Sequence, residues 1–490
     1  MLILHQLFPI TGAARKIYQS RHQIFSIDRM TFYKEDGIMS IMKNQTEDLI
    51  EKDRQYLWHH MTPYKEQAAP TIAEEGNGSW ITDSNGKKYL DAMSGLWCVN
   101  VGYGREELAL AAFEQMKKMA YFPLSQSHMP AIQLAEKLNE WLEGEYVIFF
   151  SNSGSEANEA AFKIVRQYHQ QNGDPSRYKF ISRYRGYHGN SMGALAATGQ
   201  AVRKFKYEPL TPGFIHVSPP DSYRRPDGQS IEDFNLQCAL EIEKTIVWEG
   251  EETIAAIIME PAITGGGILV PHPVYMEKVQ EICKKHGVLL IMDEVICGFG
   301  RTGKKFGHMH FNMKPDIVTM AKGLTSGYLP LSATAVRRDI YEKFKSSDEY
   351  GYFRHVNTFG GNPAACALAL KNLEIYEKEN LVERSRILGN RLREEMSELE
   401  NHPHVGDIRS FGFMLGMELV EDKKTKQPID LSKLDEIIAA CKSKGLIIGK
   451  NGATVAGYNN ILTISPPLSS TDEDVSFIVH TMKEVLLTAI

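Results

Sequence analysis

Long apolar runs, clustered charge and repeats are all absent from this sequence of 490 residues, and each absence excludes a class of protein. No apolar run approaches the roughly 18 residues that a membrane-spanning helix needs. The net charge is −6, and residues of both signs are interspersed without a basic stripe or a polybasic run. We therefore expect neither nucleic acid nor an anionic membrane as a partner.

Cysteine is scarce, and the spacings typical of metal ligands are missing. The six cysteines, at positions 98, 238, 283, 297, 366 and 441, are scattered and include no CxxC pair. That usage fits reduced thiols in the cytoplasm better than a disulfide framework or a zinc site. The histidines form no spacing such as HExxH. We expect a soluble cytoplasmic protein without a bound metal.

The first 27 residues contain Arg15, Lys16 and Arg21 but no acidic residue. A transit peptide is one interpretation, although the segment is poor in serine and ends in no pattern typical of a cleavage site. We favour the other interpretation, in which residues 1–42 are an N-terminal extension without function.

Short apolar runs alternate with amphipathic helical patterns between about residues 105 and 360. The runs are aliphatic or β-branched and nearly continuous, as in strands that are buried on both faces of a mostly parallel sheet. They are Tyr146–Phe150, Lys179–Ser182, Ile254–Met259, Val288–Met292 and Ile317–Met320. The pattern predicts an α/β fold with a mostly parallel sheet flanked by helices.

The two ends of the chain have different patterns. Before the alternating region we expect a helix over 44–58 and a hairpin over 79–91, whose two β-prone runs flank the strong turn dipeptide Asn85-Gly86. After Pro363 the pattern is helical for a long stretch. The last elements expected are strands near 411–420 and 445–449 and a helix over 472–488.

Polar and small residues directly follow four of the apolar runs. They are Ser151–Ser155, Glu260-Pro261, Asp293-Glu294 and Ala321–Gly323. In an open parallel sheet, ligands bind just beyond the carboxyl ends of the strands. Because an acid, a lysine and a small-residue loop would meet at this edge, the sequence predicts a ligand site there.

Lys322 and Asp293 have the most specific chemistry at this edge. Lys322 ends an apolar run, and burial would lower the pKa of its amine and make it nucleophilic towards an aldehyde. An exposed loop lysine is the commoner alternative. Asp293 leaves a hydrophobic strand and needs a cationic partner. That partner is either a pyridinium nitrogen or, in a structural salt bridge, Arg301.

Two further segments fit a ligand that carries a phosphate and a ring. The loop Ser153-Gly154-Ser155 precedes a helix start, where backbone N–H groups and hydroxyls can bind a phosphate. The same residues would serve equally well as an ordinary N-cap. Tyr187-His188-Gly189 offers an aromatic face for stacking, although a buried pair in a core would have the same sequence.

These segments resemble, in order, the sequence blocks of class III, fold-type I aminotransferases, which depend on pyridoxal 5′-phosphate. The resemblance runs from about residue 45 to the C-terminus, and its most specific block is IMDEVICGFGRTG (291–303). The other blocks are NSGSEANEAAFKIVR (152–166), RYRGYHG (183–189), EPAITGGGILVP (260–271), KPDIVTMAKGLTSGYLPLSA (314–333) and NTFGGNPAACALAL (357–370). Such a resemblance implies a large cofactor-binding domain over 105–363. It also implies a smaller α+β domain built from both chain ends, 43–104 and 364–490.

The resemblance implies roles for individual residues. Lys322 would bind the cofactor as a Schiff base and then move a proton between the substrate and the cofactor. Asp293 would pair with the pyridine nitrogen, while Val295 and Tyr187 would pack on opposite faces of the ring. Lys322, Asp293 and Tyr187 are therefore the candidate catalytic residues, and His188 is a further candidate for cofactor binding.

The remaining cofactor contacts that the resemblance implies include one from a second copy of the chain. Thr358 would reach the phosphate in the partner subunit, which makes a homodimer part of the expected mechanism. Glu260 would lie near the phenolic side of the ring, but Ile296 stands where many relatives have a glutamine that contacts the phenolic oxygen. The phosphate itself would be held by Ser153, Gly154 and Ser155.

Two features narrow the substrates. Ornithine- and γ-aminobutyrate-type relatives carry a gating glutamate five residues after the Glu-Pro glutamate, and it masks or uncovers a substrate-reading arginine. That position is Gly265 here, so the resemblance favours pyruvate over 2-oxoglutarate as the amino acceptor. The stretch SGLWCVNVGYG (94–104) is similar to ω-amine:pyruvate aminotransferases, in which the residue matching Trp97 lines the substrate pocket.

The segment LIIGKNGATVAGYNN (446–460) looks like that of taurine:pyruvate aminotransferases. Several pyruvate-using relatives have a mobile arginine at the position of Gly449, and the neighbouring Lys450 is our candidate for binding a substrate carboxylate or sulfonate. A loop lysine without function is an equally good interpretation. Arg301 and Arg409 are expected to hold loops through structural hydrogen bonds.

The predicted reaction moves an amino group from a primary amine, an ω-amino acid or a taurine-type donor to pyruvate, giving an aldehyde or ketone and alanine. The sequence does not identify the donor. The alternatives are an aminotransferase of the adenosylmethionine-8-amino-7-oxononanoate type, or an aminomutase or decarboxylase on the same scaffold.

Overall fold

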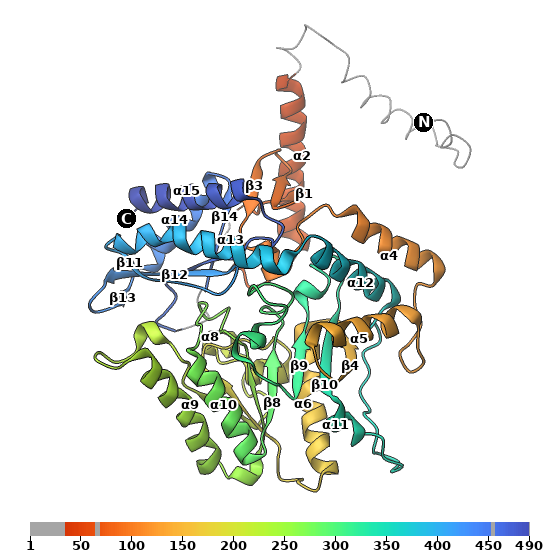
Figure 1. The fold of residues 1–490 in the computed structure, drawn as a ribbon. Coiled ribbons are helices and arrows are strands. Elements are labelled where there is room, and N and C mark those ends of the chain that lie inside the picture. Colours follow the sequence, from red (N-terminus) through yellow and green to blue (C-terminus); the bar gives the residue numbers. More distant parts are fainter. Residues whose placement is uncertain (1–34, 64–68, 452–455, 490) are drawn as a thin grey trace. The chain divides into compact units, whose positions relative to one another are not determined.

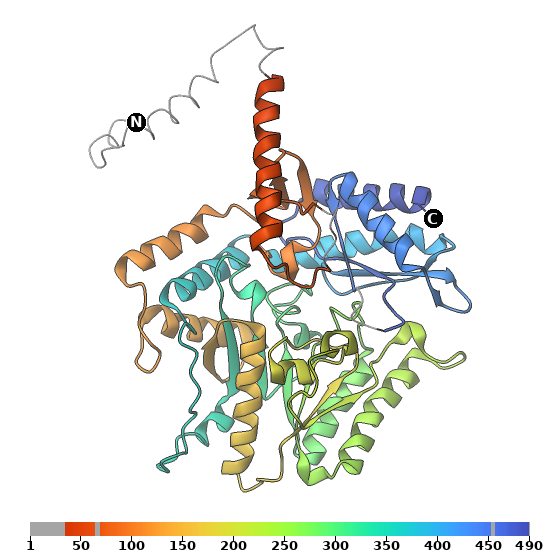
Figure 2. The same ribbon diagram turned by 180° about the vertical axis from the view of Figure 1, so that it is seen from behind.

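The computed structural model describes residues 35–63, 69–451 and 456–489, and Figures 1 and 2 show it from opposite sides. Most of the extension predicted over residues 1–42 lies outside the described residues. From Glu35 the chain forms helix α2 (Glu35–Tyr56), which begins earlier than the predicted helix over 44–58. None of the helices in the described ranges combines the length and the apolar composition that crossing a lipid bilayer would require.

The chain divides into two compact units. The first extends to Glu74 and includes Thr82–Lys87, and the second comprises Glu75–Ile81 and Lys88–Ile490. The domain boundaries expected after residues 104 and 363 both fall within the second unit and stay predictions.

A seven-stranded sheet organises the second unit. Its strands lie in the order β4 (Tyr146–Ser151), β10 (Ser332–Arg337), β9 (Ile317–Met320), β8 (Leu289–Asp293), β7 (Ile254–Met259), β5 (Lys179–Arg183) and β6 (Phe214–Val217). Strand β10 is antiparallel to both of its neighbours, and the others all run in one direction. The prediction of a mostly parallel α/β sheet is therefore confirmed.

The five strands predicted from apolar runs are all present, and their ends differ from the predicted ends by no more than one residue. Strands β6 and β10 were not predicted. The sequence of β10, SATAVR, is rich in small and polar residues, and that of β6, FIHV, contains a histidine. Neither resembles the continuous aliphatic runs of the other strands, so hydrophobic pattern alone does not reveal them.

Helices cover both faces of this sheet. Helix α6 (Gly154–Gln171) packs on one face through an apolar cluster that includes Phe162, Val165 and Ile291. Helices α9 (Ile231–Trp248) and α10 (Pro273–His286) cover the other face through a second cluster. Figure 2 shows α6 in front of the strands, and Figure 1 shows α9 and α10 from the opposite side.

A further group of three helices packs together on the β4 side of the sheet: α4 (Glu106–Lys118), α5 (Met129–Leu142) and α12 (Pro363–Lys378). The connections contain short helices. They are α3 (Ser94–Trp97), α7 (Met192–Ala197), α8 (Ala201–Lys204), α11 (Arg338–Glu342) and the 3₁₀ turns η2 (Ser222–Arg224), η3 (Glu251–Thr253), η4 (Gly307–Phe311), η5 (Lys322–Leu324) and η6 (Ser397–Asn401).

The C-terminal part builds a second sheet in the order β11 (Val405–Ser410), β12 (Leu415–Asp422), β16 (Ile461–Ile464) and β15 (Gly449–Lys450), with β13 (Gln427–Pro428) paired to β12. Three helices accompany it: α13 (Leu381–Met396), α14 (Leu431–Ser443) and α15 (Asp472–Ala489). The predicted strands near 411–420 and 445–449 and the final helix are present, whereas β11 and β16 were not predicted.

The predicted hairpin is confirmed as β2 (Trp80–Asp83) and β3 (Lys88–Asp91), and Gly86 has a positive φ of 80° in its turn. Strand β1 (Ala73–Asn77) precedes β2 in the same small sheet, and β14 (Leu446–Ile447) pairs with β3 in parallel. Segments from both ends of the chain therefore share one sheet.

Candidate active site

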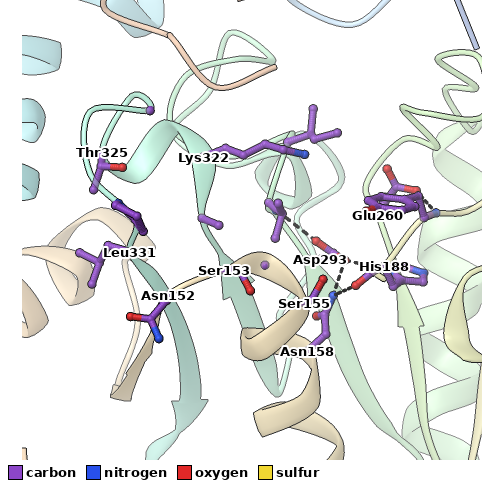
Figure 3. Close-up of a pocket in the computed structure, with 18 of the residues that line it drawn as sticks. Asn152, Ser153, Ser155, Asn158, His188, Glu260, Asp293, Lys322, Thr325 and Leu331 are labelled. Atoms are coloured by element: carbon purple, nitrogen blue, oxygen red, sulfur yellow. Dashed lines mark hydrogen bonds and ion pairs between the residues drawn. The ribbon is translucent and has the colours of Figure 1, made fainter. Parts of the chain in front are cut away.

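A cavity of about 350 Å³ lies where β4, β7, β8 and β9 end (Figure 3). Its wall combines the residues after these strands, as the sequence predicts, with the loop at 187–189. The lining residues are Asn152, Ser153, Gly154, Ser155, Asn158, Tyr187, His188, Gly189, Glu260, Asp293, Val295, Ile296, Ala321, Lys322, Thr325, Gly327, Leu329, Pro330 and Leu331. Every residue predicted to bind the cofactor, except Thr358, lines this one cavity.

Lys322 begins the turn η5 directly after β9 and Ala321, and its side chain extends across the cavity above Asp293 in Figure 3. Its φ of 45° is in the left-handed region, which costs a residue with a Cβ about 1 kcal/mol or more. The next residue, Gly323, allows this tight turn, because an added Cβ would lie 2.6 Å from Asn100 Nδ2. The backbone at Lys322 is therefore strained, and this conformation directs the amine into the cavity.

Burial lowers the pKa of the Lys322 amine from its usual value, and the nearby carboxylates of Asp293 and Glu260 oppose that shift. Desolvation removes the water that stabilises an ammonium ion. More of the amine is therefore uncharged, and able to act as a nucleophile or a base, than for a lysine on the surface.

Asp293 ends β8 and is buried beneath the cavity. Asn158 Nδ2 donates to its Oδ2 at 2.9 Å, and His188 Nδ1 lies 2.8 Å from the same oxygen. The backbone N–H of Val295 donates to Oδ1 at 3.1 Å. The salt bridge to Arg301 that the sequence left open is not formed.

Arg301 instead serves the structural role expected for it. It is fully buried, and its guanidinium donates to the carbonyl of Pro466 at 2.5 Å and to Asn100 Oδ1 at 2.7 Å. Arg409 likewise donates to the carbonyl of Gly267 at 2.8 Å. Both arginines hold loops together, and their predicted structural role is confirmed.

The loop after β4 forms the N-terminus of α6. Ser153 Oγ accepts from the backbone N–H of Glu156 at 3.3 Å, so Ser153 is the N-cap that the sequence left open as an alternative. An N-cap and a phosphate contact are compatible, since both use the first turn of one long helix. Ser155 Oγ accepts from the backbone N–H of Asn190 at 3.1 Å, which joins the two loops.

Tyr187 and Glu260 form another side of the cavity. The backbone N–H of Tyr187 donates to Glu260 Oε1 at 3.1 Å, and Thr264 donates to Oε2 through its hydroxyl at 2.5 Å and its N–H at 3.0 Å. Burial raises the pKa of Glu260, and the nearby Asp293 adds to this while His188 opposes it. The carboxyl of Glu260 therefore fixes the backbone that carries the Tyr187 ring.

The residues of the cavity fit pyridoxal phosphate. Asn158 Oδ1 is buried without a hydrogen-bond partner among the described residues, beside an Asp293 carboxylate that can face a ring nitrogen. A Cβ on Gly154 would lie 3.0 Å from both methyl groups of Val295, so only glycine lets the phosphate loop approach that side chain so closely. An acid, a lysine and a small-residue loop are the groups that this cofactor requires.

Three predicted residues lie away from the cavity lining. Trp97 is in α3 with a positive φ of 62° and packs, half-buried, against the cluster beneath α9 and α10. Thr358 lies on an exposed segment before α12. Lys450, in β15, forms an ion pair with Asp435 of α14. Their roles at the site stay predictions.

Asn158 is the residue that sequence reasoning missed. It lies in α6, is almost fully buried and connects Asp293 to the backbone carbonyl of His188, to which its Nδ2 donates at 2.7 Å. Asparagine is a poor residue for a helix interior, because its side chain competes for backbone hydrogen bonds. The sequence signal for Asn158 is its position two residues after Glu156, on a helix that starts at the site.

The comparisons with known proteins agree with this geometry. Residues 61–486 match the family model of class-III aminotransferases. A protein of Bacillus subtilis named "uncharacterized aminotransferase YhxA" is 63% identical over 452 residues, which are 92% of this chain and 99% of that protein. A taurine–pyruvate aminotransferase of Bilophila wadsworthia is 43% identical over 445 residues, 90% of this chain and 97% of that protein.

Among solved structures, an ω-transaminase of Pseudomonas jessenii in complex with PMP is 37% identical and superimposes with a TM-score of 0.86, covering 90% of this chain and 98% of that one. The family match covers residues 61–486, which include the seven-stranded sheet and all of the cavity residues. This chain belongs to the class III aminotransferases, enzymes of fold type I that depend on pyridoxal 5′-phosphate.

Proposed function

We propose that this aminotransferase moves an amino group from a primary amine, an ω-amino acid or a taurine-type donor to pyruvate, giving an aldehyde or ketone and alanine. The observation that supports pyruvate as the amino acceptor concerns Gly265. Among the described residues, a Cβ there would have only Gln200 Nε2, at 3.8 Å, and Tyr187 Cβ, at 3.9 Å, within 4 Å. Glycine at this position cannot supply the gating carboxylate that the resemblance associates with relatives of the ornithine and γ-aminobutyrate type. The similarity to a taurine–pyruvate aminotransferase supports the same acceptor.

Pyridoxal phosphate, when bound, supplies a ring that draws electrons away from the reacting carbon of the substrate. The remaining work belongs to this chain. Asp293, held by Asn158 and His188, is oriented to keep a proton on the ring nitrogen. Lys322, whose pKa burial lowers, would bind the cofactor and then take and return the substrate proton.

The platform for the ring is built from two sides. Val295 packs close to Gly154 at one side of the cavity, and Tyr187 is held by Glu260 at another. We assign the phosphate to the first turn of α6, where Ser153, Gly154 and Ser155 line the cavity. These contacts would orient the cofactor before the substrate arrives, so that a reacting amine would meet a fixed geometry.

We further propose a homodimer in which Thr358 contacts the phosphate of the partner subunit. Helix α4 and the segment after it expose large apolar side chains, among them Phe113, Met116 and Phe122. Phe359, next to Thr358, is also exposed and contacts Tyr121 edge-on at 6.3 Å. An apolar surface of this kind is typical of a protein interface. A second copy that covered it would lie against Thr358.

A cytoplasmic location belongs to the same proposal. All six cysteines are free thiols, and all but Cys98 are buried. Reduced buried cysteines fit a reducing compartment.

The test of the proposed function is spectral and chemical. The purified holoenzyme should show a visible absorption band that bleaches with an amine donor and returns with pyruvate, while alanine forms in equal amount. Lys322→Ala should lack the band and lose activity by more than about 10⁴-fold, because both cofactor attachment and proton transfer use this amine. A retained band in Lys322→Ala would contradict the assignment.

A donor screen with pyruvate fixed then identifies the amine. Taurine, β-alanine, a diamine and an aromatic amine cover the candidate classes, and alanine is the common product. Product analysis also separates the alternatives. S-adenosylmethionine as the one effective donor would indicate the 8-amino-7-oxononanoate type, carbon dioxide release a decarboxylase, and turnover without a second substrate an aminomutase.

A further inference from the structure

The turn that begins at Lys322 is strained at more than one residue. Lys322 has a φ of 45° and Ser326 a φ of 51°, both in the left-handed region, although neither is a glycine. A residue with a Cβ seldom adopts this conformation, so it persists only where the surroundings hold it. Contacts from outside the turn must therefore fix residues 322–326.

Two side chains of α12 meet this turn on the side away from the cavity lining. Asn372 and Tyr376 are four residues apart, so they lie on the same face of the helix, and both are almost completely buried. Neither lines the cavity, whereas Lys322 and Thr325 of the turn do. The turn thus lies between α12 and the cavity.

Asn372 makes three hydrogen bonds with the turn. Its Nδ2 donates to the carbonyl oxygens of Gly323, at 2.9 Å, and Leu324, at 3.0 Å. The hydroxyl of Ser326 donates to its Oδ1 at 2.9 Å. Asparagine is a poor residue for a helix interior, and an apolar side chain would pack in α12 without this cost. The bonds with the turn give a reason for an asparagine at this position.

Tyr376 adds a fourth hydrogen bond. Its hydroxyl donates to the carbonyl of Gly323 at 3.0 Å, so this carbonyl accepts from both side chains of α12. The ring packs edge-on against Trp141 at 5.6 Å, which fixes the position of the hydroxyl. A Cβ at residue 323 would lie 3.3 Å from that hydroxyl oxygen, so the close approach also favours glycine there.

We propose that Asn372 and Tyr376 are positioning residues that hold the strained turn and so keep the Lys322 amine directed into the cavity. Without their hydrogen bonds the turn relaxes for part of the time, and the amine then leaves its place. This inference rests on the proposed role of Lys322 in binding the cofactor. The groups assigned to the phosphate and the ring nitrogen lie on α6 and β8, so their geometry should not depend on α12.

The test compares two forms of the cofactor that differ in their reaction with a lysine. The aldehyde carbon of pyridoxal phosphate forms a double bond to Lys322 Nζ and releases one water. Pyridoxamine phosphate has an amine in place of the aldehyde and cannot form this bond. Only the first form should therefore depend on the direction of the amine.

Full-length Asn372→Leu, freed of cofactor, is titrated with each form, and binding is followed by protein fluorescence. We expect the Kd of pyridoxal phosphate to rise about tenfold, because the competent turn is populated for a smaller fraction of the time. The Kd of pyridoxamine phosphate should change less than about twofold. Tyr376→Phe keeps the ring and removes one hydrogen bond, so the Kd of pyridoxal phosphate should rise about threefold.

Asn235→Leu is the matched control. Asn235 is a fully buried asparagine of α9 that also makes three hydrogen bonds, and it does not line the cavity. Its replacement should lower the thermal midpoint, as that of Asn372 should, because buried polar groups lose their partners. The Kd values of both cofactor forms should nevertheless stay within about twofold of the wild type.

The outcomes separate this inference from the proposed function. Equal rises for both cofactor forms in Asn372→Leu would overturn the inference, since they would show a general loss of the site. An unchanged Kd of pyridoxal phosphate in both α12 variants, or a selective rise in the control, would overturn it as well. A wild type that forms no alanine from pyruvate contradicts the proposed function, and these binding measurements do not depend on that result.

Discussion

Asp293 and Glu418 are both buried carboxylates on strands, yet their surroundings differ. Asp293, at the end of β8, is held by an amide, an imidazole and a backbone N–H, and it borders a cavity. Glu418, within β12, accepts from Arg224 Nε at 2.8 Å and forms an ion pair with Arg409 at 2.9 Å. The cationic partners of Glu418 belong to the protein. The cationic partner expected for Asp293 is instead a positively charged group of a bound ligand.

The difference shows how a buried acid can be assigned to structure or to function. A carboxylate between two arginines is compensated by the fold, and removing it leaves buried positive charge. A carboxylate held by amide and imidazole groups beside an open cavity keeps its charge available for a cation that binds there. The following predictions separate the two situations by experiment.

The largest effect on activity is expected for Asp293→Asn. A charge pair at about 4 Å with an effective dielectric near 20 is worth roughly 4 kcal/mol, so kcat should fall about 10³-fold. Thermal stability should change by only a few degrees, because the amide keeps the size of the side chain and can still accept hydrogen bonds. The two readouts are single-turnover rate and thermal denaturation. An active Asp293→Asn variant would contradict the pairing with the ring nitrogen.

Glu418→Gln should behave in the opposite way. Breaking a buried ion pair on one side costs about 3 kcal/mol or more, so the free energy of unfolding should fall by that amount in urea denaturation. The folded fraction should keep kcat/KM within about threefold of the wild type, because Glu418 does not line the cavity. A Glu418→Gln variant that keeps its stability but loses its activity would contradict the assignment of Glu418 to structure and Asp293 to function.

A pH effect is expected from His216, beside the second cavity that Asp221 and Arg224 also line. Burial and the neighbouring Lys204 lower the pKa of His216 to about 4. Between the ordinary pKa of about 6.5 and 4, the unfolded chain binds a proton at this histidine that the folded chain does not. The free energy of unfolding should therefore decrease as the pH falls through this range.

His216→Gln should make that decrease smaller in urea denaturation series at pH 7, 6, 5 and 4. The control is His480→Gln, which changes an exposed histidine, 80% accessible at its side chain. Its pH dependence should follow the wild type. Identical slopes for His216→Gln and the wild type would contradict the role of His216.

The smallest effect is expected for Lys450→Ala. The side chain is paired with Asp435 and exposed, and such pairs contribute at most about 1 kcal/mol. The Michaelis constants for pyruvate and for the amine should change less than twofold. A selective rise in the Michaelis constant for pyruvate in this variant would support Lys450 as the residue that binds the substrate carboxylate.

The sheet that positions the cofactor-binding residues was predicted well from the sequence. Five of its strands are continuous aliphatic runs, and polar or small residues follow four of them. Lys322, Asp293 and the loop at 153–155 are therefore found by pattern, and the resemblance to a family adds their roles. Strand β10 was not predicted, because its small residues, such as Ala333 and Ala335, give no pattern that differs from that of a loop.

The surroundings of the cavity were harder to predict, since their residues come from segments without a shared pattern. Arg203 lies in a four-residue helix, and only the fold brings it onto the ring of Tyr187, which lines the cavity. The sequence does not connect Asn158 with Asp293, because the role of Asn158 depends on which face of α6 packs towards β8. Lys450 was chosen by its place beside Gly449, and sequence cannot show that Asp435 lies next to it.

The antiparallel strand β10 has a consequence for the order of folding. Strand β4 lies at the edge of the sheet and pairs only with β10 among the described strands, although β10 follows it much later in the chain. Strand β4, which leads into the loop that starts α6, can therefore complete its pairing in the sheet only after β10 has been synthesised and placed between β4 and β9. Strand β10 also follows Lys322 in the chain, so both the lysine and the phosphate loop are synthesised before the strand that links β4 to β9. A chain interrupted before residue 332 would contain most of the residues that line the cavity, but it would lack the strand that joins β4 to the rest of the sheet.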